Sequence, residues 1–141
     1  MPAGPRDELY RTGESVRRAV FGDAHVDRPT SAFDGPFVEY VTRGAWGQVW
    51  ARPGLDRRTR SCLTLALLAA LRCEDELAMH VAAAIRLGVT PLEIREVLLH
   101  SAVYAGAPAG NAAFAVARRV LAELGIDLDA DPSLSADPGA R

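Results

Sequence analysis

Three residues whose side chains can do chemistry lie at helical spacing: Cys73, Glu76 and His80 follow one another at intervals of three and four. On a helix this spacing places all three side chains on one face. A carboxylate one turn from an imidazole can orient the ring or raise its pKa, so Glu76 and His80 form a candidate proton-transfer pair. The alternative is a surface ion pair without a catalytic role. Because no third His or Asp follows at a recognisable interval, we expect no metal site.

Cys73 raises an oxidoreductase alternative. A thiol near a histidine can attack peroxides or disulfides when its pKa falls. However, Glu76 stands where a resolving cysteine is expected, and Cys62 lies in an apolar segment, where we expect a buried, inert thiol. A thiol-dependent reductase is therefore the second functional hypothesis. A non-catalytic, ligand-binding helical oligomer is the third.

Arginine supplies all 16 basic side chains, and the chain contains no lysine. This composition excludes a lysine Schiff base and a lysine-anchored pyridoxal phosphate. The guanidinium group offers a planar fork that matches a carboxylate, so arginines alone can hold a small anion. Candidates are Arg52, in a Pro/Gly turn, and the cluster Arg57, Arg58 and Arg60 that follows it.

The N-terminal part of the chain predicts two helices. Residues 7–21 have an amphipathic pattern that ends at Gly22. The turn-rich segment 22–36 follows, and there we expect His25 to be a loop residue. Pro36 suits the first turn of a second helix, which runs to Trp50. Gly44 and Gly47 flank Trp46, which indicates close approach of another backbone or a ligand near the indole.

The remaining pattern predicts four further helices. Residues 63–71 are apolar on nearly every side, which is typical of a buried helix too short to span a bilayer. The candidate proton-transfer face follows, and Gly88 ends its helix. Thr90 and Glu93 form a capping box at the start of the next helix. Small residues in 109–124 allow close packing, and Tyr104 just before them can donate a hydrogen bond into a pocket. We therefore expect an all-α fold of about six helices.

Composition limits the classes of function. With 141 residues and 49% hydrophobic content, we expect one domain over 1–125 and a disordered tail over 126–141. A net charge of −2 without basic blocks argues against nucleic-acid binding. The first residues lack the apolar stretch of a signal peptide, and two cysteines make no disulfide framework, so we expect a cytoplasmic protein without membrane partners.

Several segments carry a resemblance to a known family: VRRAVFGDAHVDR, AWGQVWARPGLDRRTRSCLTLALLAAL, ELAMH and GVTPLEIREVLLHSAVYAGAPAGNAAFAVA. In this order, over about residues 10–124, the chain resembles the gamma-carboxymuconolactone decarboxylase family. The resemblance implies an AhpD-like helical fold, a homo-oligomer that is expected to be a hexamer, no cofactor, and a place in protocatechuate breakdown. Related alkylhydroperoxidases carry the motif Cys-x-x-Cys-x-x-x-His with a carboxylate residue upstream of it. In this chain Glu76 replaces the second Cys of the motif, and Ser61 occupies the position of the upstream carboxylate residue.

The reaction that this resemblance implies is loss of CO2 from a dicarboxylate lactone, gamma-carboxymuconolactone, to give beta-ketoadipate enol-lactone. On this interpretation His80 delivers a proton or stabilises the lactone oxygen, and Glu76 holds its ring. Arg52 and Arg58 bind the substrate carboxylates. The apolar wall would be formed by Trp46 and Trp50, with Tyr104 as the next proton donor. A related lactone or a beta-keto acid is the alternative substrate, besides the thiol oxidoreductase.

Overall fold

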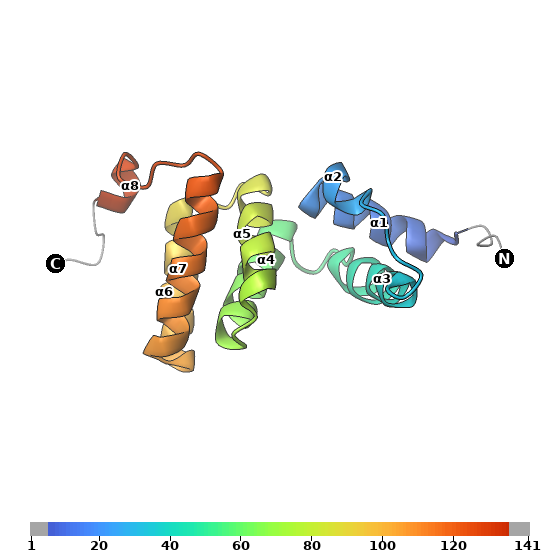
Figure 1. The fold of residues 1–141 in the computed structure, drawn as a ribbon, viewed down its shortest axis with the longest axis horizontal. Helices are drawn as coiled ribbons and strands as arrows, with labels where there is room; N and C mark the ends of the chain where they lie inside the picture. Colours follow the sequence, from blue (N-terminus) through green and yellow to red (C-terminus); the bar gives the residue numbers. More distant parts are fainter. Residues whose placement is uncertain (1–5, 136–141) are drawn as a thin grey trace. The chain divides into compact units, whose positions relative to one another are not determined.

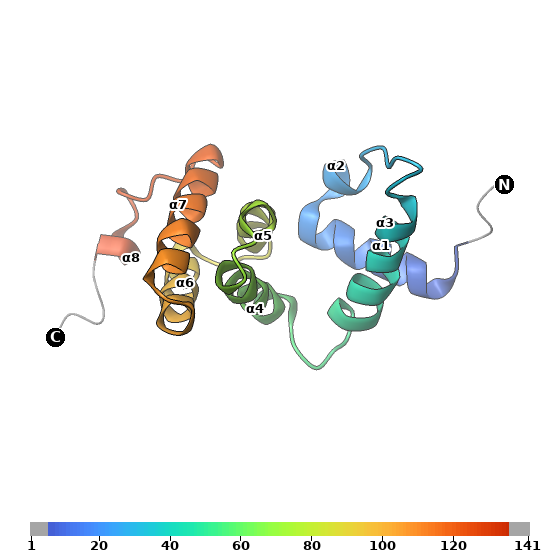
Figure 2. The same cartoon turned by 60° about the horizontal axis from the view of Figure 1, so that its bottom comes forward.

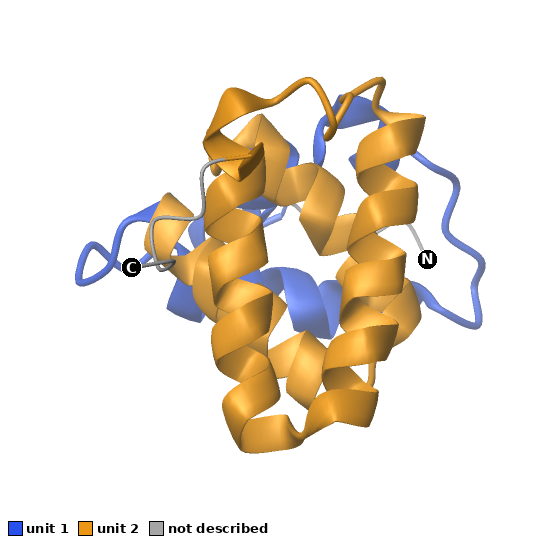
Figure 3. Cartoon of the chain, turned by 90° about the vertical axis from the view of Figure 1, so that its left-hand side faces the viewer, with its two compact units in different colours: residues 1–57 blue, residues 58–141 orange. Residues whose placement is uncertain are grey.

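Every regular element in residues 6–135, the part of the chain that the computed structural model describes, is helical, which confirms the predicted all-α class. Six of the α-helices have seven residues or more. The chain divides into two compact units, residues 1–57 and residues 58–141, which are coloured separately in Figure 3. Each unit is described by itself. None of the described helices is long and apolar enough to cross a membrane.

Unit 1 is built on a first helix that is held at both ends by side chains. The Asp7 carboxylate accepts a hydrogen bond from the amide of Tyr10 at 3.0 Å and caps this helix. Gly22, with φ of 87°, separates it from a short second helix. The Arg18 guanidinium contacts Asp23 at 3.2 Å and Asp27 at 2.7 Å. The elements of this unit are α1 (Glu8–Phe21), α2 (Asp23–Val26), α3 (Gly35–Val41) and the π-helix η1 (Thr42–Trp50).

The second predicted helix changes its register in the middle. It begins as α3 and continues as η1, in which the amide of Ala51 donates to the carbonyl of Trp46, five residues back, at 3.1 Å. Such wide turns are rare in proteins, and many of the known examples lie at functional sites. A Cβ atom on Gly47 would lie 2.9 Å from the carbonyl oxygen of Leu9, which confirms the predicted close approach of another backbone. Gly44 has no such neighbour, because only the Tyr40 ring comes within ordinary contact distance of it.

Unit 2 is a set of longer helices, drawn from green to red in Figures 1 and 2. Helix α7 packs against both α5 and α6. A Cβ atom on Gly110 would lie 2.8 Å from the Cβ of Ala102, so the small residues of α7 do bring the helices close together, as predicted. The elements are α4 (Arg57–Ala70), α5 (Glu74–Arg86), α6 (Pro91–Ala105), α7 (Ala107–Glu123) and α8 (Pro132–Ser135).

The core of unit 2 is aliphatic and draws on all four long helices. The apolar segment in α4 is less buried than the sequence predicts. Its inward face is buried, but Leu63, Leu67 and Leu71 are 49%, 61% and 70% exposed. The prediction of a helix buried all round is therefore wrong for this chain alone. The buried members of the core are Leu65, Ala69, Leu77, Val81, Ala84, Val89, Ile94, Leu98, Ala113, Val116, Ala117, Val120 and Leu121.

The start of α6 and the C-terminal segment complete unit 2. The hydroxyl of Thr90 accepts from the amide of Glu93 at 3.1 Å, and the Glu93 carboxylate accepts from the amide of Thr90 at 3.2 Å, which confirms the capping box. Ile126 and Leu128 pack on the core, and Arg95 donates to the Leu134 carbonyl at 3.1 Å. The sequence predicts disorder for residues 126–135, but in the structure their apolar side chains pack against the core of unit 2. Residues 136–141 lie outside the described part.

Candidate active site

Helix α5 carries the predicted proton-transfer face. Cys73 is its N-cap residue, Glu76 is exposed in the first turn, and His80 is half-buried one turn later. Leu77 and Ala84, three residues before and four after His80, are buried. The face therefore runs from a solvated carboxylate to an imidazole that is partly shielded from water, which suits a group that handles protons. Within residues 6–135, no three His, Cys, Asp or Glu side chains gather as a metal site requires.

The two cysteines are both half-buried, and neither takes part in a disulfide. The sulfur of Cys73 lies 3.8 Å from the carbonyl oxygen of Leu71, which precedes a residue with φ of 60°, Arg72. Cys62, which the sequence predicts to be buried, is only partly so. Neither cysteine forms a disulfide, so Cys73 has no oxidised resolving partner in this structure.

Arg58 is held by unit 2 itself. Its Nη2 donates to both carboxylate oxygens of Glu93, at 2.6 and 2.8 Å, and to the carbonyl of Gly88 at 3.1 Å. The amide of Thr90 and then the Arg58 guanidinium keep the pKa of Glu93 below its usual value. All three hydrogen bonds use Nη2, so they fix the position of the Arg58 guanidinium. The N–H groups of Nη1 can still donate to a substrate carboxylate. Glu93 of the capping box thus also positions Arg58, which is predicted to bind a substrate carboxylate.

The two tryptophans of η1 are in contact. Their ring centroids are 4.9 Å apart, and Trp46 is buried whereas Trp50 is half-buried. The Phe21 ring meets Trp46 edge-on at 5.4 Å, and the His25 ring lies 4.5 Å from Phe21. The four rings form an aromatic row, defined here as His25, Phe21, Trp46 and Trp50. The two tryptophans that the sequence analysis predicts to form an apolar wall are therefore in contact, as part of a longer row of rings within unit 1.

His25 is a histidine for which the sequence analysis predicts no chemical role. It lies in the helical turn α2 rather than in a loop, and Arg28 Nη2 lies 2.9 Å from its Nδ1. Burial, and then the nearby Arg28 and Arg17, lower the pKa of His25. The interval of four between Phe21 and His25 could have indicated that their rings are in contact. Gly22 lies between them and argued against a helix there, so this contact was not predicted.

Arg52 and Tyr104 are placed at exposed positions. Arg52 follows η1 in a turn, where its amide donates to the carbonyl of Val49 at 3.1 Å. Tyr104 is 81% exposed near the end of α6, with its ring 5.4 Å from that of His100. Tyr104 therefore faces solvent rather than a pocket within this unit.

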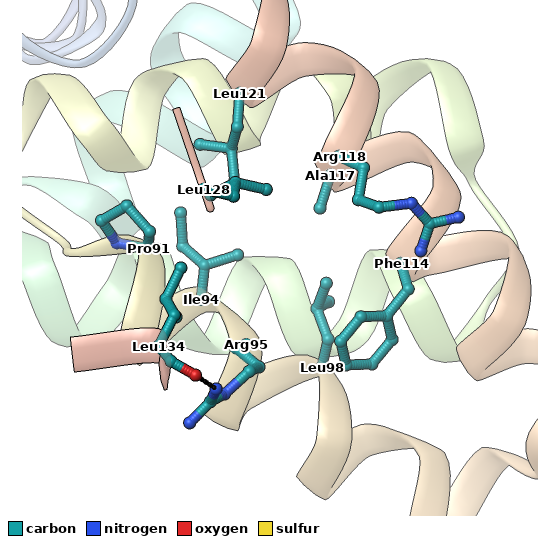
Figure 4. Close-up of a pocket in the computed structure, with 10 residues that line it drawn as sticks. All are labelled: Pro91, Ile94, Arg95, Leu98, Phe114, Ala117, Arg118, Leu121, Leu128 and Leu134. Atoms are coloured by element: carbon teal, nitrogen blue, oxygen red, sulfur yellow. Dashed lines mark hydrogen bonds between the residues drawn. The ribbon is translucent and has the colours of Figure 1, made fainter. Parts of the chain in front are cut away.

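A pocket of about 100 Å³ opens between α6, α7 and the C-terminal segment of unit 2 (Figure 4). Its wall is apolar, and Arg95 at its edge holds the Leu134 carbonyl. None of the predicted site residues lines it. We therefore assign this pocket to the packing of the C-terminal segment rather than to catalysis. Its lining residues are Pro91, Ile94, Arg95, Leu98, Phe114, Ala117, Arg118, Leu121, Leu128 and Leu134.

Comparison with known proteins gives the family. Residues 35–119 match the carboxymuconolactone decarboxylase family. A 4-carboxymuconolactone decarboxylase of Acinetobacter baylyi is 46% identical over 85% of this chain and 92% of its own length. The nitrosuccinic acid decarboxylase npaB of Metarhizium robertsii is 43% identical over 84% of this chain and 87% of its own. A shorter 4-carboxymuconolactone decarboxylase sequence of Pseudomonas putida is 54% identical over 28% of this chain and 90% of its own. A match of this extent means that the chain belongs to the carboxymuconolactone decarboxylase family.

Proposed function

We propose that this chain decarboxylates gamma-carboxymuconolactone to beta-ketoadipate enol-lactone without a cofactor, as a step of protocatechuate breakdown. The observation that carries the proposal is the 46% identity, over 85% of the chain, to a protein named 4-carboxymuconolactone decarboxylase. Supporting it are the arginines, which suit the carboxylates of the substrate, and the aromatic row, which suits a flat ring. The absence of lysine fits a route without a Schiff base.

The chemistry needs no external electron acceptor. When the bond between the ring carbon and its carboxylate breaks, CO2 leaves and the electron pair stays on the ring. The pair moves through the ring double bond into the lactone carbonyl and gives a furan-like dienolate. Protonation of this dienolate on carbon yields the enol-lactone. The protein has to hold the acetate arm, stabilise the developing negative oxygen and deliver one proton.

We assign these tasks to individual residues. Arg52 and Arg58 bind substrate carboxylates, and the positioned Nη1 of Arg58 makes it the better defined of the two. His80 delivers the proton and Glu76 holds its ring, with Tyr104 as the next proton donor. Trp46 and Trp50 provide an apolar surface for the leaving carboxylate, because binding that group as tightly as the transition state would not speed its departure.

The direct test is to mix the purified protein with gamma-carboxymuconolactone and to measure CO2 and the loss of lactone. Release of CO2 with multiple turnovers, after exhaustive dialysis against a chelator, is the expected result. A rate equal to that of the buffer would rule the function out. Tight stoichiometric binding without turnover would instead favour a ligand-binding module.

Arg52→Ala and Arg58→Ala should raise KM by about tenfold or more and lower kcat less, since a lost carboxylate clamp mainly weakens substrate capture. Steady-state kinetics on each variant measures this. Glu93→Gln is the matched control for Arg58, because glutamine preserves the capping box but removes the charge that holds the guanidinium. If Arg58 only stabilises the start of α6, Arg58→Ala and Glu93→Gln should lower the free energy of unfolding by the same small amount and leave KM unchanged.

The fungal relative favours a second candidate, decarboxylation of a different small dicarboxylate. Its name specifies nitrosuccinic acid, and it is 43% identical over 84% of this chain. Measuring kcat/KM for both substrates and for a beta-keto acid decides between them. The compound with the highest kcat/KM by at least about tenfold is taken as the substrate class.

A thiol oxidoreductase is separated from a decarboxylase by one substitution. Cys73→Ser should leave CO2 release within about twofold of wild type, because the decarboxylation requires no thiol. A reductase that uses Cys73 as its nucleophile would lose essentially all peroxide or disulfide turnover. Parallel assays of both activities on wild type and variant measure the difference, with Cys62→Ser as the control.

We also propose a cytoplasmic homo-oligomer, expected to be a hexamer. Leu63 and Leu67 on α4, with Leu71 directly after its end, form an exposed apolar stripe at intervals of four. Such a stripe on a soluble chain commonly marks a protein contact. Sedimentation at micromolar concentration should give a single oligomeric species, and Leu67→Glu should dissociate it. A stable wild-type monomer would contradict the proposal.

A further inference from the structure

We propose that His25 acts in its neutral form as the hydrogen-bond donor that stabilises the developing lactone oxyanion. This inference rests on the proposed decarboxylation and assigns it a catalytic residue outside helix α5.

The contact with Arg28 fixes which nitrogen of His25 carries the proton. A guanidinium can only donate hydrogen bonds, so the Nη2 of Arg28, 2.9 Å from Nδ1, requires an unprotonated Nδ1. The ring is then neutral and carries its single proton on Nε2. The arrangement therefore presents a neutral N–H donor at Nε2.

The charges around His25 favour the same state. Arg17 on α1 and Arg28 after α2 both disfavour a second proton on the ring, and partial burial acts in the same direction. The carboxylates on α2 and just after it do not oppose this effect, because Asp23 and Asp27 are held by Arg18 at 3.2 and 2.7 Å. Glu14 acts on Arg17, but the net effect of Arg28, Arg17 and partial burial on His25 is a lowered pKa.

The aromatic row places this donor beside the proposed apolar wall. The His25 ring lies against Phe21 at 4.5 Å, and Phe21 lies against Trp46 at 5.4 Å. A flat lactone ring that stacks on this row would bring its exocyclic carbonyl oxygen, where the negative charge develops, within reach of the His25 Nε2–H at the end of the row. Rings held by stacking also keep the donor preorganised, which is the condition for strong oxyanion stabilisation.

A neutral donor suits this reaction better than an imidazolium. The dienolate has to be protonated on carbon, so its oxygen needs stabilisation without receiving the proton. A neutral imidazole is a weak acid and leaves the negative charge in the ring system, whereas an imidazolium would transfer its proton to oxygen. Neutral histidines serve as electrophilic donors in this way in enolate-forming enzymes.

The test compares two replacements of His25 in the full-length protein. His25→Phe keeps the stacking but removes the donor, and it should lower kcat by about 100-fold with KM within about threefold. His25→Gln keeps an N–H group and should retain at least about a tenth of the wild-type kcat. Circular dichroism establishes that both variants are folded. If His25→Phe keeps wild-type kcat while the wild type releases CO2, this role is overturned and the proposed function stands. If the wild type releases no CO2, both fall.

Arg28→Met tests the role of His25 through the pH profile of kcat, which should not change if His25 has only a structural role. Removing this cation raises the pKa of His25, so the low-pH limb of the kcat profile should move to higher pH. Arg11→Met, which removes an exposed arginine of α1, is the matched control and should leave the profile unchanged. ¹⁵N NMR of the imidazole at neutral pH should show Nε2 protonated and Nδ1 unprotonated. A doubly protonated ring, or an unmoved profile in Arg28→Met, would overturn the inference.

Discussion

His80→Ala should lower kcat for decarboxylation by about 100-fold or more while changing KM by no more than about threefold. His80 is assigned to proton delivery, and a group that acts mainly in the transition state affects turnover rather than substrate capture. Its half-buried position on α5, next to buried Leu77, shields the proton transfer from bulk water. Steady-state kinetics with the lactone measures both constants. His100→Ala, which removes an exposed histidine of α6, is the matched control and should have near-normal kcat.

Glu76→Gln should fall between wild type and His80→Ala. The amide keeps the shape of the side chain but removes the carboxylate that is proposed to hold the His80 ring. The value of kcat should therefore fall by less than in His80→Ala, with little change in KM, when both constants are measured by steady-state kinetics with the lactone. If His80→Ala retains near-normal kcat, the proton comes from another residue, with Tyr104 next, and the α5 face is not the catalytic one.

Local patterns predicted the helices because most of their signals are short-range. The capping box of Thr90 and Glu93 spans three residues, so its residue types nearly determine its hydrogen bonds. Gly47 predicted a close backbone neighbour because a glycine within a helix needs such a reason. The identity of that neighbour, Leu9, could not be predicted, since it depends on how α1 packs on η1.

The parts of the candidate site that the sequence did not predict depend on contacts between distant residues. Arg58 and Glu93 lie 35 residues apart, and nothing local indicates that their side chains pair. The π-helical register of η1 has no recognised signal in the residue types, although the interval of four already makes Trp46 and Trp50 neighbours on a helix. His25 was missed for a different reason. Its residue type is ordinary in a loop, and no local pattern indicates its contacts with Arg28 and Phe21.

Gly13→Ala should destabilise unit 1 by about 3 kcal/mol or more, although alanine is the better helix former. Gly13 is buried in the middle of α1, and an added Cβ atom would lie 2.0 Å from the carbonyl oxygen of Thr42 and 3.0 Å from the amide nitrogen of Gly47. Helix propensity alone would stabilise the alanine variant by about 1 kcal/mol. The opposing contact is with backbone, which cannot rotate away as a side chain can, so α1 has to separate from η1 and lose packing.

Urea unfolding at one protein concentration, followed by tryptophan fluorescence, measures this effect because Trp46 and Trp50 both belong to unit 1. Gly35→Ala is the matched control, since nothing lies within 4 Å of a Cβ atom at that first position of α3. It should change the free energy of unfolding by less than about 1 kcal/mol. Equal midpoints for the two variants would mean that α1 and η1 do not pack at backbone contact.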